Sequence, residues 1–217
     1  MRVIVFDTET TGLPKLNNVS AKKMQDNWPH IVSISWMVLE NDVPIHARSY
    51  IVKPHGWTIT AESVMIHGIT HEQAVKEGRE LQFVIDEFIC EAYDLLLAHN
   101  LYFDENVLVN AIYWDLGRKN FLEFPERKRC TMRLSSDICK IPSLYHNGYK
   151  QPKLSELYKF VFGKDPIMKN LHNSMYDVEV LVKILQHSAE LRSKLGFTQQ
   201  TLITNNVAPA FSKTLSL

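Results

Sequence analysis

The chain has 217 residues, of which 45% are hydrophobic and 22% are charged, and this ordinary globular composition excludes a disordered, collagen-like or coiled-coil protein. Lysine plus arginine equals aspartate plus glutamate, at 24 each. A chain without net charge lacks the positive field that holds a long nucleic acid through many phosphate contacts, so any grip on nucleic acid must be local.

The length favours one domain, because a domain has about 150 residues and two independent domains would be cramped. We expect this domain at residues 1–195, with an insertion loop at 15–29 and a tail at 196–217. No run approaches the ~18 apolar residues that cross a bilayer, and the N-terminus has no signal-peptide pattern. We therefore expect a cytoplasmic protein without a membrane partner.

The first quarter of the chain predicts three neighbouring strands. Residues 2–7 form a β-branched and aromatic run, typical of a buried strand. After the polar stretch at 15–29, residues 31–39 and 46–52 flank a polar turn at 40–42, which is the signal of a hairpin. At least one pair of these strands is therefore expected to be antiparallel.

Helical periodicity begins near residue 60. Thr70 fits the first position of a capping box, and apolar residues recur at helical spacing over 81–92. The short apolar run 94–98 predicts a strand covered on both sides. In the helix that follows, Asp104 lies at the head of the apolar stripe, so its carboxylate is expected to face inward.

The last part of the chain is mainly helical. Residues 118–152 show no clear pattern, whereas 154–162 predicts a helix that ends at Gly163, and 177–194 predicts another. Strands followed by alternating strands and helices favour an α/β fold, with a mixed sheet and helices packed on it.

Two acids stand at the end of the first predicted strand. Asp7 and Glu9 are two residues apart, so both carboxylates point to the same face. Buried carboxylates are costly unless they are compensated, and hard divalent cations compensate them well. The alternative is that these acids cap a turn, with neighbouring threonines supplying local hydrogen bonds.

Asp104 and Asp177 each stand near the start of a predicted helix, where an aspartate can also serve as an N-cap. Acids at strand ends and helix starts of an α/β sheet tend to converge at one edge. Four converging carboxylates would bind two divalent cations, Mg²⁺ or Mn²⁺, about 4 Å apart, as in phosphodiester hydrolysis. His172, five residues before Asp177, is a candidate general base, although it could also be an unrelated surface histidine.

Three segments together carry a family resemblance. Residues 7–13 (DTETTGL), 98–104 (AHNLYFD) and 172–177 (HNSMYD) resemble the three motifs of the DnaQ-like (DEDDh) 3′→5′ exonucleases, the family of the proofreading exonuclease subunit of bacterial replicative DNA polymerases. Residues 66–70 and 153–158 are similar to two further family segments. The resemblance implies a ribonuclease-H-like fold, with a mixed five-stranded sheet flanked by helices in a single domain.

The resemblance also implies roles for individual residues. The cations would be held by four acids, and together with the general base these would form the catalytic set: Asp7, Glu9, Asp104, Asp177 and His172. Substrate contacts would come from Thr10, Gly12 and Leu13 at the terminal nucleotide, Ile66 and His67 on the opposite wall, and Asn100 and Phe103 near the next phosphate and base. For Leu13, Ile66 and Phe103, an ordinary place in the core is the open alternative.

The expected activity is therefore two-metal-ion 3′→5′ exonuclease hydrolysis of single-stranded DNA, which releases 5′-mononucleotides. Two alternatives stay open: an oligoribonuclease-like or ribonuclease T-like enzyme acting on short RNA, and a non-catalytic module that binds nucleic acid or a polymerase. The expected partner is a DNA 3′ end, with a DNA polymerase as a further candidate. DNA replication, DNA repair and nucleotide recycling are all compatible with this chemistry, and the oligomeric state is open.

Overall fold

A computed structural model describes residues 1–121, 124, 127–145, 147–167 and 172–197. Its described strands form one five-stranded sheet in the order β3-β2-β1-β4-β5. β1 pairs antiparallel with β2 and parallel with β4, β2 pairs antiparallel with β3, and β4 pairs parallel with β5. The strands are β1 (Arg2–Thr10), β2 (Ile31–Glu40), β3 (Val43–Ile51), β4 (Leu95–Ala98) and β5 (Lys128–Cys130).

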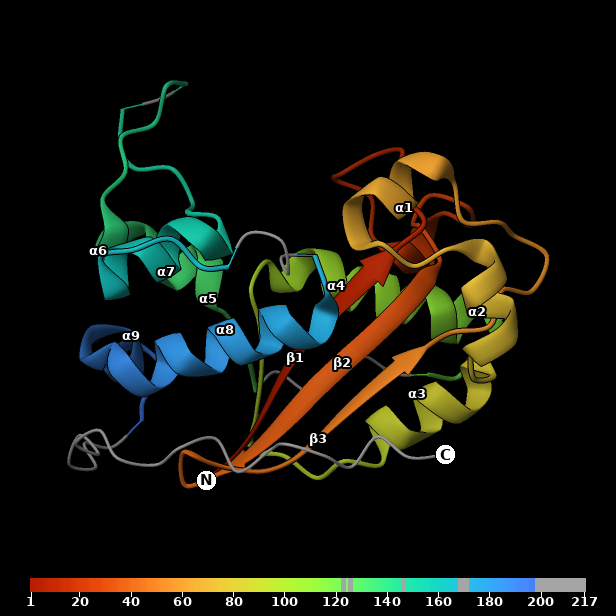
Figure 1. Cartoon of the computed structure of the whole chain (residues 1–217), viewed down its shortest axis with the longest axis horizontal. Helices are drawn as coiled ribbons and strands as arrows, with labels where there is room; N and C mark the ends of the chain where they lie inside the picture. The colour runs from red at the N-terminus through yellow and green to blue at the C-terminus, as the bar shows by residue number, and fades with distance from the viewer. Residues whose placement is uncertain (122–123, 125–126, 146, 168–171, 198–217) are drawn as a thin grey trace.

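The helices cover both faces of the sheet (Figure 1). Between β3 and β4 lie α1 (Ala61–His67), α2 (His71–Glu77) and α3 (Leu81–Ile89). β4 leads into α4 (Leu101–Asn110), which continues as the π-helical turn η2 (Ala111–Asp115). The later helices are α5 (Thr131–Leu134), α6 (Ser136–Cys139), α7 (Leu154–Phe162), α8 (Ser174–His187) and α9 (Ala189–Lys194), and a short 3₁₀ turn, η1 (Ala21–Lys23), precedes β2. The expected mixed sheet flanked by helices is confirmed.

Strand β1 lies at the centre of the sheet and contributes to both cores. Ile4 and Phe6 pack in the core that contains α3 and α4, whereas Val3 and Val5 pack in the core that contains α8. Successive strand residues point to opposite faces, so each odd-numbered residue of β1 continues toward α8. This alternation decides where the acids at the end of β1 point.

The expected hairpin is present, and its turn is a two-residue loop. Asn41 and Asp42 both have positive φ angles, of 49° and 71°. Asparagine and aspartate tolerate this conformation, and two successive positive φ values match the right-handed twist of the flanking strands.

One predicted helix is wrong in extent. The helix expected at 177–194 is two helices, because α8 begins at Ser174 and ends at His187. The side chain of Ser188 accepts a hydrogen bond from the backbone N–H of Leu191 at 3.3 Å and so caps α9. The first strand also runs three residues further than expected, to Thr10.

The insertion at 15–29 is packed against the body of the fold. Asn106 of α4 accepts a hydrogen bond from the backbone N–H of Ala21 at 2.8 Å, and the buried indole of Trp28 donates to the carbonyl of Val19 at 2.8 Å. The Trp28 ring also contacts Tyr102 and Phe103 of α4.

Of the expected tail, residues 198–217 lie outside the described residues. Within the described ranges, no helix combines the length and apolar character needed to cross a membrane.

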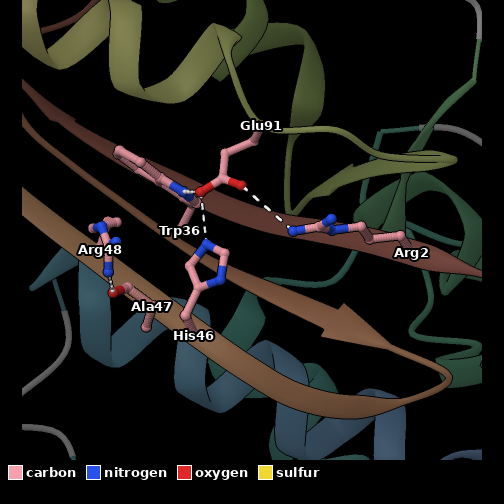
Figure 2. Close-up of polar contacts among 6 residues, drawn as sticks. All are labelled: Arg2, Trp36, His46, Ala47, Arg48 and Glu91. Carbon is pink, nitrogen blue, oxygen red and sulfur yellow. Dashed lines mark hydrogen bonds and ion pairs between the residues drawn. The ribbon is translucent and has the colours of Figure 1, made fainter.

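A half-buried carboxylate ties the end of α3 to three strands (Figure 2). Glu91 accepts hydrogen bonds from Trp36 Nε1 at 3.1 Å and from His46 Nε2 at 2.6 Å, and it lies 3.9 Å from the guanidinium of Arg2. Burial alone would raise the pKa of Glu91, but the bonds from His46 and Trp36 outweigh it and hold that pKa below its usual value.

Replacing this carboxylate should destabilise the fold. Glu91→Ala leaves the donors of Trp36 and His46 unpaired, and we expect the free energy of unfolding in urea to fall by about 1–3 kcal/mol at pH 7. Because the folded pKa is lowered, this stability exists above the unfolded value of 4.5 and is lost as the pH falls below it. The exposed Glu77→Ala on α2 is the control, and equal losses in both variants would contradict the role of Glu91.

Candidate active site

The acidic end of β1 lies beneath the first turn of α8. Asp7 and Glu9 share the face of β1 that looks toward α8, and their partners in β2 are Ser35 and Ser33. The hydroxyl of Ser174, the first residue of α8, lies 2.8 Å from Ser35 Oγ and 3.2 Å from Ser33 Oγ. These contacts fix the start of α8 against β2, beside the two acids.

Asp177 and His172 reach the same place from the start of α8. One ligand atom each of Glu9, His172 and Asp177 lies within 4.8 Å of the other two. His172 is exposed and has a left-handed φ of 65°, directly before Asn173, which caps α8 by accepting the N–H of Tyr176 at 3.2 Å. This sharp turn before the helix brings the imidazole next to the carboxylates.

Asp104 approaches from the opposite face of the sheet. Its Oδ1 accepts hydrogen bonds from the backbone N–H of Thr8 at 3.1 Å and from Thr8 Oγ1 at 2.7 Å. Thr8 points toward α4 because its neighbours Asp7 and Glu9 point toward α8. A single strand end thus carries two acids on one face and the anchor for a third acid on the other.

The alternative that Asp104 and Asp177 are helix caps is wrong. Each is the fourth residue of its helix, and the cap positions belong to Asn100 and Asn173. Asp104, only 3% exposed, bonds to a residue 96 positions away rather than to its own helix end. Both aspartates are therefore available to a shared site.

Burial raises the pKa values of all four acids, and the charges of neighbouring acids add to this for Asp7, Glu9 and Asp104. Burial raises the pKa of Asp7 well above its usual range, and the charges of Asp104, Asp177 and Glu9 add to this. Burial raises the pKa of Glu9 to about 9, with further contributions from Asp177 and Asp104. It raises the pKa of Asp104 to about 7 against the hydrogen bonds from Thr8, and that of Asp177 to about 6 against the backbone of His172.

The cluster suits a divalent cation. Crowded carboxylates cannot all ionise near neutral pH without a compensating charge. Within the described part of the chain, no lysine or arginine forms an ion pair with any of the four acids. Asp177 Oδ1 is buried without a hydrogen-bond partner among the described residues. Carboxylate oxygens whose negative charge has no nearby cation are the ligands that Mg²⁺ and Mn²⁺ prefer.

A family model decides the class of protein. The model described as exonuclease (RNase_T) matches residues 4–185. The chain belongs to the exonuclease family. The expectation of a nuclease, a hydrolase of the exonuclease class, is thereby confirmed. No curated protein matches the sequence.

Solved structures of exonucleases share the fold. Exonuclease X in complex with 5′ overhanging duplex DNA has a TM-score of 0.55 and 21% identity, covering 89% of this chain and 98% of its own. A zinc-bound complex of Escherichia coli exonuclease I with single-stranded DNA has a TM-score of 0.64 and 16% identity, covering 90% and 42%. Exonuclease I of Methylocaldum szegediense has a TM-score of 0.61 and 14% identity, covering 90% and 43%. The chain thus spans nearly all of the exonuclease X chain but less than half of the exonuclease I chains.

In this exonuclease-family chain, the turn after β1 is open to solvent. Leu13 is 82% exposed and Ile66 is 56% exposed, so the alternative that they belong to the core is wrong. Thr10 Oγ1 donates to the carbonyl of Gly12 at 2.7 Å, and Gly12 has a φ of 150° with open space where a side chain would stand. Phe103 is half-buried and packs on Trp28, with ring centroids 5.9 Å apart.

The other expected contact residues differ in their surroundings. His67, at the end of α1, is buried, and its Nδ1 accepts the N–H of Ile69 at 3.1 Å. Its Nε2 therefore carries the proton, and within the described residues this buried donor makes no hydrogen bond of good geometry. Burial lowers the pKa of His67, the Thr10 backbone opposes this, and His172 lowers it further. Asn100 has a left-handed φ of 76° and is half-buried at the start of α4.

His99 is a residue near the site to which the sequence assigned no role. Its Nε2 donates to the carbonyl of Pro152 at 3.0 Å, and its Nδ1 lies 3.1 Å from Thr131 Oγ1. Burial lowers the pKa of His99 to about 4, so the ring is neutral at neutral pH. The only sequence signal for it is its place at the end of a buried strand, directly before Asn100.

The crowding of the acids leads to a testable effect on stability. Asp104→Asn keeps the oxygen that accepts from Thr8 but removes a buried charge. In EDTA at pH 8 we expect the free energy of unfolding to rise by about 1–4 kcal/mol. The folded pKa of Asp104 is raised, so its destabilising effect grows as the pH rises from 3.8 to about 7, and the gain should shrink toward pH 4.

Urea titrations of the metal-free protein at pH 8 and pH 5 measure this gain. Asp137→Asn is the control, because that side chain is 78% exposed. If Asp104→Asn were less stable than the unmodified protein in EDTA at pH 8, the Asp104 carboxylate of the unmodified protein would already be compensated, which would contradict the prediction.

Proposed function

We propose that the chain is a two-metal-ion 3′→5′ exonuclease of the DnaQ-like type, which releases 5′-mononucleotides from the 3′ end of single-stranded DNA. The observation that carries this proposal is the convergence of acids from β1, α4 and α8 beside an imidazole.

Asp7, Glu9, Asp104 and Asp177 would hold two divalent cations, Mg²⁺ or Mn²⁺. When bound, such a pair of cations supplies an activated water and stabilises the leaving oxygen of a phosphodiester. The raised pKa values of all four acids and the unpartnered Oδ1 of Asp177 support this assignment. Asp7 is the candidate for a ligand shared by both ions, because all three other acids raise its pKa.

His172 would act as the general base. Imidazole exchanges protons near neutral pH, and His172 lies within 4.8 Å of Glu9 and Asp177 ligand atoms while its side chain stays exposed. It could therefore take a proton from a water at the carboxylates and pass it to solvent. Hard cations prefer oxygen ligands, which favours the role of base over that of metal ligand.

The terminal nucleotide would lie between the turn after β1 and the end of α1. The exposed Leu13 offers an apolar surface to a base, and the open space at Gly12 lets a sugar approach the backbone. On the opposite wall, Ile66 is exposed, and the buried His67 Nε2, which lies near the Thr10 backbone, is a donor suited to a phosphate or hydroxyl oxygen. Asn100 and Phe103 would border the next nucleotide.

DNA is favoured over short RNA as the substrate. The structurally similar exonucleases X and I were solved with duplex and single-stranded DNA, respectively. A DNA polymerase partner and a role in proofreading, as in the DnaQ-like subunit, stay predictions from the sequence resemblance.

Digestion of matched DNA and RNA strands tests the proposal. With Mg²⁺, a strand labelled at its 5′ end and free at its 3′ end should shorten by single nucleotides, and a blocked 3′ end should prevent this. EDTA and Asp7→Asn should each stop the reaction, because each leaves the carboxylate site without its cations. Internal cuts, equal cleavage of blocked strands, or full activity of Asp7→Asn would contradict the proposed activity.

The general base has its own test. His172→Ala should lower kcat by about 10²- to 10⁴-fold with a smaller effect on KM, and the pH–rate profile should change. His187→Ala, an exposed histidine at the other end of α8, is the matched control and should leave both parameters unchanged. A His172→Ala enzyme with an unaltered pH profile would assign the proton transfer to another group.

A further inference from the structure

The segment between α6 and α7 forms a projecting loop with a hydrogen-bonded stem. The N–H of Ser143 donates to the carbonyl of Gly148 at 2.9 Å, and the N–H of Lys150 donates to the carbonyl of Ile141 at 2.9 Å. Pro142 and Tyr149 form an antiparallel bridge between them. Figure 1 shows the loop rising from α6 and α7 well beyond the rest of the chain. The stem thus pairs residues 141–143 with residues 148–150.

The tip of this loop exposes two large side chains. Leu144 is 92% exposed and Tyr145 is 94% exposed, the highest values among the large hydrophobic residues described. The backbone N–H of Tyr145 donates to Ser143 Oγ at 3.2 Å, which fixes the local turn. Side chains so fully exposed contribute nothing to the core, so their apolar surface is available for a contact with another molecule.

The base of the loop is tied to the edge of the sheet that carries the acids. The loop leads into Pro152, whose carbonyl accepts the hydrogen bond from His99. His99 follows β4 and directly precedes Asn100, from which α4 carries Asp104 into the acidic cluster. The loop is therefore anchored at the end of the strand that positions one of the catalytic acids.

The charge of the loop indicates what it contacts. Residues 140–153 contain three lysines and no acidic residue. Lys140 and Lys153 are exposed, whereas Lys150 pairs with Glu156. Proteins hold unpaired nucleotides with basic residues and exposed aromatic rings, because phosphates meet the cations and any base can stack on the ring, and this loop carries both.

We propose that this loop is a second contact for the substrate strand, in which Tyr145 and Leu144 stack on unpaired bases upstream of the cleaved 3′ end while Lys140 and Lys153 face its phosphates. This inference rests on the proposed function, since it assumes that the strand ending in the active site is a single-stranded nucleic acid. Short substrates would occupy only the acidic site, whereas longer ones would also reach the loop.

Binding and cleavage by the full-length chain test this contact. The variant Leu144→Ser/Tyr145→Ser should bind a labelled 15-nucleotide DNA strand in EDTA at least about 5-fold more weakly, the lower end of what one aromatic–base stack contributes. In Mg²⁺, its kcat/KM should fall similarly on that strand and stay unchanged on a trinucleotide. The separate variant Tyr145→Phe, which keeps the aromatic ring, should bind the 15-nucleotide strand as the unmodified protein does. Unchanged binding of the 15-mer by the serine variant would overturn the proposal.

Val43→Ser/Ile45→Ser is the matched control, because it removes two exposed apolar side chains from the edge strand β3. It should bind both oligonucleotides as the unmodified protein does. An equal loss in this control would mean that the effect is not specific to the loop and would overturn the proposal. So would a change in sedimentation of the loop variant without a change in DNA binding, since the tip would then contact protein.

A direct probe separates this inference from the proposed activity. Tyr145→Trp places a fluorophore at the tip, and addition of the 15-mer in EDTA should quench its emission, whereas the trinucleotide should not. Quenching by a protein that cleaves nothing in Mg²⁺ would support the contact and reject only the exonuclease activity. Absence of quenching under conditions in which anisotropy shows binding would reject the contact alone.

Discussion

The crowding of four carboxylates at the end of β1 is the constraint on which the rest of the structure depends. Like charges in a buried place are unfavourable, so the fold must hold them by other contacts. Alternation along β1 directs Asp7 and Glu9 to one face and Thr8 to the other, where it fixes Asp104. The hydroxyl cluster at Ser174 fixes α8 over the first face. Neutral hydrogen bonds thus position the acids without neutralising them.

Features with a strong local pattern could be predicted from the sequence. The hairpin follows from two β-branched runs and a polar turn, whose Asn41 and Asp42 tolerate positive φ. The inward position of Asp104 follows from its place on the apolar stripe of a helix. The meeting of acids from β1, α4 and α8 follows from a general property of α/β sheets, in which strand ends and helix starts share an edge.

Other features depend on contacts between distant residues and left no local pattern. Apolar periodicity continues through Ser188, so a single helix was expected where the hydroxyl caps a new one. The insertion at 15–29 consists mostly of polar residues, which predicts an exposed loop, but the ring of Trp28 is buried against α4. In the basic strand β5, Lys128 pairs with Glu105 of α4, a contact between residues 23 positions apart. His99 gains its role only from the approach of Pro152.

The chain has no net charge, and its basic side chains are partly paired with acids. Among the described residues, several lysines and arginines form ion pairs with acids, as Lys150 does with Glu156. Exposed apolar side chains occur instead at Leu13, shortly after β1, and at Ile66 in α1. Contacts of this kind recognise bases rather than phosphates and are weakly screened by salt. In the proposed function, such contacts would hold a strand at its last nucleotides, which is the part of the strand that an exonuclease must position.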